Sequence, residues 1–209
     1  MKIDFSLPKT ILPFLKDKVD DYYLAGGTAL AMFYYEHRES FDLDFFTTEK
    51  TFSATEVIGH MPDGWETDIV REGTIYGRLC GAQISFIAYP FFIPRVAPEH
   101  YGGIAILAPA DIAVMKIVAI SQRGRKRDFI DLFWYAMHSE PLQDVLLRLP
   151  DQYPIVAHDY HHILKSLVYF VDAEEDPMPK LLFTAEWKEV KRYFRREVPR
   201  VARHLLRLS

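Results

Sequence analysis

The sequence predicts an α/β (α+β) protein in which a mixed, twisted sheet with flanking helices is followed by a C-terminal helical lobe. Three observations predict this fold. A short β-prone run at 22–25 leads through two glycines into an apolar helical segment. Later β-like runs are separated by Gly73 and Gly81, as hairpin turns would separate them. From Pro109 onwards the pattern is helical. We expect a core over residues 1–138 and a helical lobe over 139–209.

The core is expected to alternate helices and strands. An amphipathic pattern at 11–21 predicts a short helix before the first strand. A Ser-x-x-Glu capping box opens a predicted helix at 53–61. Proline disrupts strand pairing, so Pro90 and Pro94 are expected to end the sheet. The runs expected to form its hairpin strands are 65–71, 74–80 and 82–89.

The C-terminal part is expected to be helical. Pro109 and Asp111 suit a helix start, and a second helix is expected to open at Asp128. The remaining predicted segments are helices at 143–149 and 155–170, an acidic linker at 172–179, and a last helix at 184–208 that breaks before Pro199.

Composition indicates a cytoplasmic protein without a membrane partner. The 209 residues are 49% hydrophobic, which is ample for a core. The one cysteine forms no internal disulfide, as is usual in a reducing compartment. Residues 1–10 lack the apolar core of a signal peptide, and no uncharged apolar stretch approaches the roughly 18 residues that span a bilayer.

Charge is unevenly distributed along the chain. The net charge is −4, but residues 186–209 hold eight Lys/Arg and three Glu, a net charge of +5, which leaves −9 on the remainder. A basic C-terminal segment on an acidic body is a candidate surface for nucleic acid or a partner. A solvated helix face is the alternative.

An acidic pair is the first candidate site. Asp42 and Asp44 lie in Phe41-Asp42-Leu43-Asp44-Phe45, an alternation that predicts a strand. Strand residues i and i+2 point to one face, ~6.6 Å apart along the chain. Their charges repel, and a divalent cation with oxygen ligands would offset that repulsion. The alternative is a half-buried strand with a solvated acidic face, which so short a motif favours when taken alone.

A glycine turn precedes this strand. Gly26-Gly27-Thr28 follows the run 22–25 and opens the helical segment 29–35. Glycines between a strand and a helix let backbone N–H groups approach a phosphate, and a helix N-terminus favours its charge. Thr28 is expected either to cap the helix or to bond the phosphate. A plain capped turn is the alternative. The turn and the acidic strand together are more specific than either alone.

These motifs resemble those of a known family. The segments Gly-Gly-Thr-Ala-Leu-Ala, His-Arg-x-Ser and Asp-x-Asp-Phe-Phe are similar to the first motifs of AbiEii-type nucleotidyltransferases. These are toxins of toxin–antitoxin and abortive-infection systems within the polymerase β-like nucleotidyltransferase superfamily. The resemblance implies that core fold, with Mg²⁺ or Mn²⁺ held by Asp42 and Asp44. It implies nucleotide contacts from Gly26, Gly27, Thr28, Arg38 and Ser40.

A second informative stretch spans residues 109–137. Lys116 is the lone charge from 112 to 120 in a helix that is apolar on all sides. We expect it to be partly buried and to face carboxylates or phosphate, rather than to snorkel to solvent. The basic turn at 123–127 then runs into Asp128 and Asp131. Acids in a first helical turn suit the helix dipole, which suffices for Asp131. For Asp128 a salt bridge or an active-site role competes.

The later motif also resembles the family, with one departure. The order Lys116, Arg123, Lys126 or Arg127, then Asp128 implies that Lys116 and Asp128 complete the catalytic site and that Arg123 and Lys126 bind nucleotide. Polymerase β-like transferases commonly carry a third acid on a later strand. The matching strand at 83–87 has Ser85 in that position. A hydroxyl does not replace a carboxylate as general base. Asp128 and Asp68 are the candidate substitutes.

The resemblance implies Mg-dependent transfer of a nucleotidyl group from a nucleoside triphosphate (NTP) to an acceptor hydroxyl. Lys116, with Arg38 and the basic turn, would neutralise charge on the leaving pyrophosphate. The family implies RNA, including tRNA, as acceptor and a cognate antitoxin as partner. A small molecule or a protein hydroxyl is the alternative acceptor. The competing hypothesis, for which Ser85 is the main argument, is a catalytically inactive nucleotide-binding or interaction module of the same fold.

Overall fold

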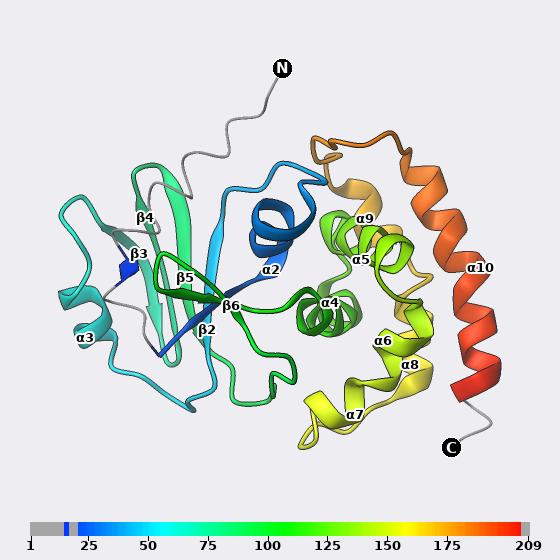
Figure 1. Cartoon of the computed structure of the whole chain (residues 1–209), viewed down its shortest axis with the longest axis horizontal. Coiled ribbons are helices and arrows are strands. Elements are labelled where there is room, and N and C mark those ends of the chain that lie inside the picture. Colours follow the sequence, from blue (N-terminus) through cyan, green and yellow to red (C-terminus); the bar gives the residue numbers. More distant parts are fainter. Residues whose placement is uncertain (1–14, 17–20, 206–209) are drawn as a thin grey trace. The chain divides into compact units, whose positions relative to one another are not determined.

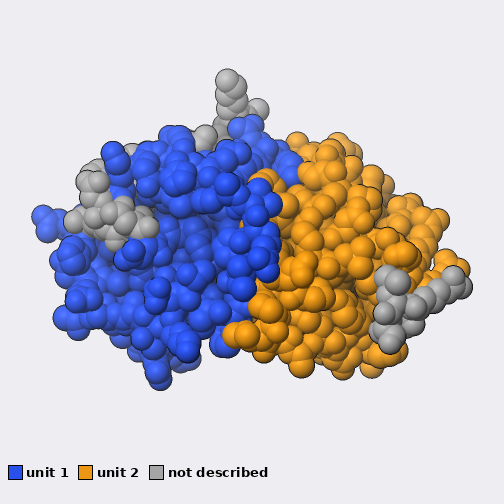
Figure 2. Space-filling model, turned by 60° about the horizontal axis from the view of Figure 1, so that its bottom comes forward, with its two compact units in different colours: residues 1–108 blue, residues 109–209 orange. Residues whose placement is uncertain are grey.

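The computed structural model describes residues 15–16 and 21–205, so most of the helix predicted at 11–21 lies outside the described residues. The chain forms two compact units, residues 1–108 and residues 109–209, which Figure 2 shows in blue and orange. The predicted end of the core at residue 138 falls within the second unit and stays a prediction about where the catalytic part ends. Among the described helices, none is both long and apolar enough to cross a membrane.

The first unit is built on a mixed sheet in which seven strands are described (Figure 1). Two pairs of neighbouring strands in this sheet, 43–47 with 82–88 and 23–25 with 104–106, are parallel, and the other neighbouring pairs are antiparallel. The predicted mixed sheet is therefore confirmed. In spatial order the strands are β3 (Glu66–Arg71), β4 (Thr74–Leu79), β5 (Ala82–Ala88), β2 (Leu43–Thr47), β1 (Tyr23–Ala25), β7 (Ile104–Ile106) and β6 (Glu99–Tyr101).

A helical segment joins the two central strands β1 and β2. It begins as α2 (Gly26–Ala29) directly after β1 and continues as the π-helix η2 (Leu30–Tyr35). It ends at Glu36, which has a left-handed backbone with φ of 46°. The connection confirms the predicted passage from strand through glycines into helix.

The predicted hairpins and capped helix are also present. Strands β3, β4 and β5 form consecutive antiparallel pairs, and the turns between them contain Gly73 and Gly81 at φ of 65° and 81°. Helix α3 (Ala54–Gly59) begins after Ser53, whose Oγ accepts a hydrogen bond from the Glu56 N–H at 3.3 Å. Short local signals thus located these elements to within one or two residues.

The expectation that Pro90 and Pro94 end the sheet is wrong. Strands β6 and β7 follow them and form a hairpin around Gly102 and Gly103, both at positive φ. Each strand has only three residues, too few to show a clear alternation of polar and apolar side chains. The Gly-Gly pair was the available hairpin signal.

One face of the central strands forms the core of the first unit. Leu43 and Phe45 of β2 are fully buried. The Phe45 ring stacks on Phe86 of β5, with ring centroids 5.4 Å apart, and Tyr22 meets Phe86 edge-on. Asp44 lies between these residues in sequence and is part-exposed. Burial of the apolar residues therefore fixes which face of β2 carries the acidic side chain.

The described part of the second unit is helical, as predicted. Asp159 caps α8 (Tyr160–Ser166), which is shorter than the helix predicted at 155–170. Helix α9 (Val171–Glu175) occupies the start of the predicted linker. The helices are α4 (Pro109–Arg123), α5 (Lys126–His138), α6 (Leu142–Leu147), α7 (Leu149–Gln152), α8 (Tyr160–Ser166), α9 (Val171–Glu175) and α10 (Trp187–Leu205).

An aromatic cluster holds α5 and α10 together. The Phe129 ring lies 5.4 Å from Phe194, 5.1 Å from Phe170 and 5.9 Å from Trp187. The predicted break before Pro199 is wrong, because α10 continues through it. Pro199 removes one backbone hydrogen bond, and the buried residues on both sides of it, Val198 and Val201, keep the helix packed.

Candidate active site

The acidic pair lies at the start of the central strand β2. Asp44 is the second residue of β2, and Asp42 immediately precedes the strand. Along β2, buried residues alternate with part-exposed ones, and both aspartates are part-exposed. The alternation predicted from sequence is confirmed, and it leaves the carboxylates beside the core rather than within it.

Ser85 lies next to Asp44 across the parallel pair β2–β5. The two residues are register partners, and Ser85 Oγ donates a hydrogen bond of 2.6 Å to Asp44 Oδ1. The strand predicted over 83–87 is therefore present and brings Ser85 beside the acidic pair, and its correspondence to the third-acid position stays a prediction. A buried hydroxyl, rather than a third carboxylate, stands beside Asp44.

Gly26 approaches the other oxygen of the same carboxylate. Gly26 has φ of +75°, and a Cβ placed there would lie 3.0 Å from Asp44 Oδ2. The approach follows from the antiparallel register, which pairs Ala25 with Asp44. This position needs glycine for two reasons: the left-handed backbone and the absence of space for a side chain.

Thr28 does not cap the helix, contrary to one of its two expected roles. The N-cap position is Ala25, and Thr28 lies inside α2. The Thr28 and Ser40 hydroxyls are 2.8 Å apart and hydrogen-bonded, which joins the glycine turn to the segment before β2. Arg38, also predicted to contact nucleotide, is buried, and its Nη1 donates to the Glu39 carbonyl at 2.9 Å.

The donor set around Asp44 suits a hard divalent cation. Asp44 Oδ2 accepts no hydrogen bond from the described residues, so this part-exposed oxygen is available to a ligand. Asp42 adds a second carboxylate, and oxygen donors are those that Mg²⁺ and Mn²⁺ prefer. Within residues 15–16 and 21–205, no three His, Cys, Asp or Glu side chains cluster as metal ligands would.

Asp68 does not substitute for the third acid. It lies on β3, which β4 and β5 separate from β2, so three strand spacings place it ~14 Å from Asp44. Its carboxylate is paired instead with Arg78 at 2.9 Å. The distance across the sheet, which sequence does not reveal, excludes this candidate.

A buried ion-pair cluster is the main feature of α4 and α5 in the second unit. Lys116 is 5% exposed, and its Nζ lies 2.7 Å from Asp128 Oδ1 and 2.8 Å from Asp131 Oδ2. The prediction was a partly buried lysine facing carboxylates or phosphate, and the structure shows a buried lysine that faces two carboxylates. Asp131, which the helix dipole seemed to explain, is a full member of the cluster. Its spacing of three residues from Asp128 was the signal.

The charges of the cluster keep Asp128 ionised. Burial alone would raise its pKa, but Lys116, which also donates a hydrogen bond, and Arg123 outweigh burial and hold the pKa below the ordinary value of 3.8. The Arg123 Nε donates to Asp128 Oδ2 at 3.2 Å, and 54% of the Arg123 side chain is exposed. Arg123 is thus the member of the cluster that solvent reaches.

Lys126 is hydrogen-bonded to Asp176, the first residue after α9. Its backbone N–H donates to Asp176 Oδ2 at 2.8 Å, and its Nζ donates to the Asp176 carbonyl. The ammonium also lies 5.5 Å from the centre of the Trp187 ring. Asp176 was missed by sequence reasoning, because nothing local indicates that the acidic linker returns to the N-terminus of α5.

Comparisons with known proteins agree with this fold and these motifs. The model of the family of AbiEii nucleotidyl transferase toxins of type IV toxin–antitoxin systems matches residues 14–67 and 82–206. The uncharacterised protein aq_aa25 of Aquifex aeolicus (strain VF5) is 37% identical over 188 residues, which cover 86% of this chain and 87% of the relative.

Two solved structures from Helicobacter pylori share the fold. One is a candidate nucleotidyltransferase, which matches with a TM-score of 0.56 at 17% identity and covers 99% of both chains. The other is JHP933, with the same TM-score and identity over 99% of this chain and 96% of that one. The α/β fold predicted from sequence, a mixed sheet followed by helices, is confirmed, and these two structures share it. With a matching family model over most of its length, this chain belongs to the AbiEii family of nucleotidyltransferase toxins.

Proposed function

We propose that this protein is a metal-dependent nucleotidyltransferase that moves a nucleotidyl group from an NTP to a hydroxyl of RNA. The observation that carries the proposal is the Asp44 carboxylate, with one oxygen fixed by Ser85 and the other open beside Gly26. A carboxylate held beside a glycine turn suits a metal-bound triphosphate.

In this proposal Asp42 and Asp44 hold Mg²⁺ or Mn²⁺. The cation would neutralise charge on the triphosphate and polarise it for attack. Gly26 and Gly27 let the backbone approach the phosphates, and the start of the α2–η2 segment directs N–H groups towards them. Thr28 and Ser40, hydrogen-bonded to each other, keep this turn in register with β2.

The transfer itself is an in-line substitution at phosphorus. The acceptor oxygen attacks the α-phosphorus, the bond to the bridging oxygen breaks, and pyrophosphate leaves. The hydroxyl proton passes to water or to a carboxylate of the acidic pair. Arg38 and Arg123 are the proposed cations that offset the charge on pyrophosphate.

Lys116 and Asp128 take positioning roles in this proposal. Two carboxylates already neutralise Lys116, so it is better placed to fix Asp128 than to meet phosphate. Asp128 in turn orients Arg123. Lys126, held by the Asp176 carbonyl, is proposed to keep the basic turn in place beside the N-terminus of α5.

The family description, a nucleotidyl transferase toxin of type IV toxin–antitoxin systems, supports a cognate antitoxin as partner. RNA, including tRNA, is the acceptor that the motif resemblance implies, and it is part of this proposal. The rival function is an inactive nucleotide-binding module. It is favoured by one observation, the hydroxyl of Ser85 where a third acid is expected.

Binding of NTP tests the site without assuming an acceptor. Each NTP is titrated with Mg²⁺ into wild type and the Asp42→Asn/Asp44→Asn variant by calorimetry. We expect metal-dependent binding in wild type and none in the variant, with similar thermal unfolding. Asp68→Asn is the matched control, because Asp68 is an exposed carboxylate on the same sheet. Equal NTP affinity in wild type and the double variant would exclude the acidic pair as the site.

A further inference from the structure

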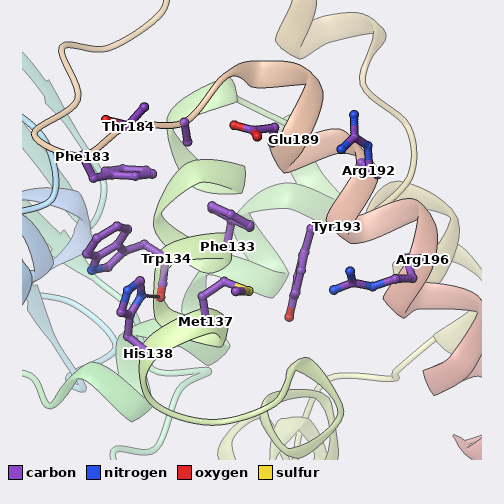
Figure 3. Close-up of a pocket in the computed structure, with 11 residues that line it drawn as sticks. Phe133, Trp134, Met137, His138, Phe183, Thr184, Glu189, Arg192, Tyr193 and Arg196 are labelled. Atoms are coloured by element: carbon purple, nitrogen blue, oxygen red, sulfur yellow. Dashed lines mark hydrogen bonds between the residues drawn. The ribbon is translucent and has the colours of Figure 1, made fainter.

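A pocket of about 360 Å³ in the second unit is not used by the proposed transfer site. It lies among α5, α10 and the segment 183–185 that precedes α10. Figure 3 shows Phe183 and Trp134 on one side of the pocket and Tyr193 on the other, with Phe133 and Met137 between them. Its volume falls within the range of pockets that bind small organic groups, about 300–1,000 Å³.

The aromatic lining is held in place by packing. Trp134 stacks on His138, with ring centroids 3.8 Å apart, and lies 4.2 Å from Phe183. His138 Nδ1 is hydrogen-bonded to the Trp134 carbonyl at 2.8 Å. On the other wall Phe133 meets Tyr193 edge-on at 5.3 Å. These are flat apolar surfaces of the kind on which nucleobases stack.

Two arginines from successive turns of α10 line the same pocket. Arg192 makes no ion pair with any described residue. Arg196 pairs through Nε with Glu197 at 2.5 Å, and its guanidinium lies 5.7 Å from the Tyr193 ring centre. Like charges four residues apart on a helix repel, and a bound anion would relieve that repulsion. Guanidinium groups bind phosphate bidentately.

The basic surface continues along α10 beyond the pocket. Exposed cations recur about every turn from Lys188 to Arg203, ~22 Å along the helix axis. Mononucleotide binding would not use so long a row, whereas the backbone of a strand follows such a charged path. Acids interrupt the row only in part, since Glu197 pairs with Arg196 and Arg200.

We propose that this pocket binds one unpaired nucleotide of a single-stranded RNA. The base stacks on Phe183 and contacts Trp134 and Tyr193, and its flanking phosphate lies on Arg192 and Arg196. Glu189, which also lines the pocket, is an acceptor for an exocyclic amine and so favours adenine, guanine or cytosine over uracil. The site rests on the proposed function only in that RNA is taken to be the acceptor whose strand docks here.

The test measures the binding of fluorescein-labelled oligo-A RNA by anisotropy, without NTP or metal. Arg192→Gln/Arg196→Gln removes the two pocket cations. Arg200→Gln/Arg203→Gln removes the same charge from the same helix outside the pocket. We expect the first pair to raise Kd by about 100-fold, because it removes two direct guanidinium–phosphate contacts. We expect the second pair to raise Kd by about 10-fold or less, because it removes only long-range electrostatic attraction.

Two further measurements test the stacking. Phe183→Ala, on the segment before α10, is expected to raise Kd about tenfold, within the range for loss of a base-stacking contact, with little change in thermal unfolding. Quenching of tryptophan fluorescence by RNA should disappear in Trp134→Phe, which keeps an aromatic wall and removes the reporter.

Four results would overturn the proposal. Equal losses in the two arginine pairs would mean diffuse electrostatic attraction. Unchanged affinity in Phe183→Ala together with quenching retained in Trp134→Phe would exclude the pocket. Competition by polyglutamate as strong as by unlabelled RNA would indicate an acidic protein partner. Free AMP binding as tightly as oligo-A would indicate a mononucleotide site.

The binding assay contains no NTP, so it tests the pocket separately from nucleotidyl transfer. RNA binding that depends on the pocket would support this proposal even if the protein transferred no nucleotide. Nucleotidyl transfer without pocket-dependent RNA binding would support only the proposed function.

Discussion

At the residue scale, the two oxygens of Asp44 have different environments. Oδ1 accepts the hydrogen bond from Ser85, while Oδ2 lies beside the Gly26 backbone. The hydrogen bond from Ser85 fixes the orientation of the carboxylate. The absence of a side chain at Gly26 leaves room beside Oδ2. This arrangement explains how an acidic side chain is tolerated in a central strand, where aspartate is otherwise rare.

Replacing Ser85 with aspartate tests whether residue 85 occupies the position of the third acid. In Ser85→Asp a second carboxylate would face Asp44, so the variant should be less stable than wild type without metal. Mg²⁺ should restore it, by about 2.7 kcal/mol at a hundred times its Kd. Ser85→Asn has the same shape without the charge and is the control. Thermal unfolding with and without Mg²⁺ measures both, and a Ser85→Asp variant that metal does not stabilise would contradict the assignment.

The buried cluster predicts a large effect for Lys116. Lys116→Met leaves Asp128 and Asp131 without their main cation, which should lower the free energy of unfolding by about 3–5 kcal/mol. Lys165→Met, on the exposed side of α8, should change it little. Urea unfolding distinguishes the two. Equal free energies of unfolding for both variants would show that Lys116 makes no net contribution to the stability of the fold.

Acid should reveal the depressed pKa of Asp128. Because the folded pKa lies below the ordinary value of 3.8, the stabilisation is complete above that value and is lost as pH falls through the folded pKa. The difference in unfolding free energy between wild type and Asp128→Asn should therefore shrink as pH falls below 3.8. A constant difference from pH 6 to pH 3 is incompatible with a depressed Asp128 pKa.

At the element scale, the junction of β1 and α2 is the most constrained part of the candidate site. A short strand, a glycine at positive φ and a helix follow one another without a loop. Each is predictable from local sequence, because glycine and apolar spacing act over a few residues. The π-helical continuation and the unbroken α10 were not predictable, because packing rather than local preference decides them. The β6–β7 hairpin had only its Gly-Gly pair as a local signal, because its strands are too short to show alternation.

Gly26→Ala should disturb this junction. The left-handed backbone costs about 1–2 kcal/mol for a residue with a Cβ, and contact with Asp44 Oδ2 adds to it. We expect lower stability and weaker binding of Mg·NTP. Gly59→Ala, at the end of α3 with open space around it, should be neutral or slightly stabilising. If both variants bind NTP like wild type, Gly26 does not shape the site.

At the scale of the whole molecule, the candidate functional residues belong to two units. The first carries the acidic pair and the glycine turn, and the second carries the buried ion-pair cluster and the basic helix α10. The sequence alone was enough to identify the two members of the acidic pair, to place Ser85 on the strand beside Asp44 and to predict that Lys116 is partly buried. The roles of Asp131 and Asp176 and the exclusion of Asp68 required the fold, since each depends on distances between segments that are remote in sequence.

Label transfer tests the central claim most directly. Total RNA is incubated with Mg²⁺ and with NTPs labelled at the α- or γ-phosphate, using wild type and Asp42→Asn/Asp44→Asn. The proposed reaction predicts that wild type attaches α-label to RNA, that γ-label leaves with pyrophosphate, and that the variant attaches neither. Failure of wild type to label RNA, attachment of γ-label, or equal labelling by the variant would contradict nucleotidyl transfer at the acidic pair.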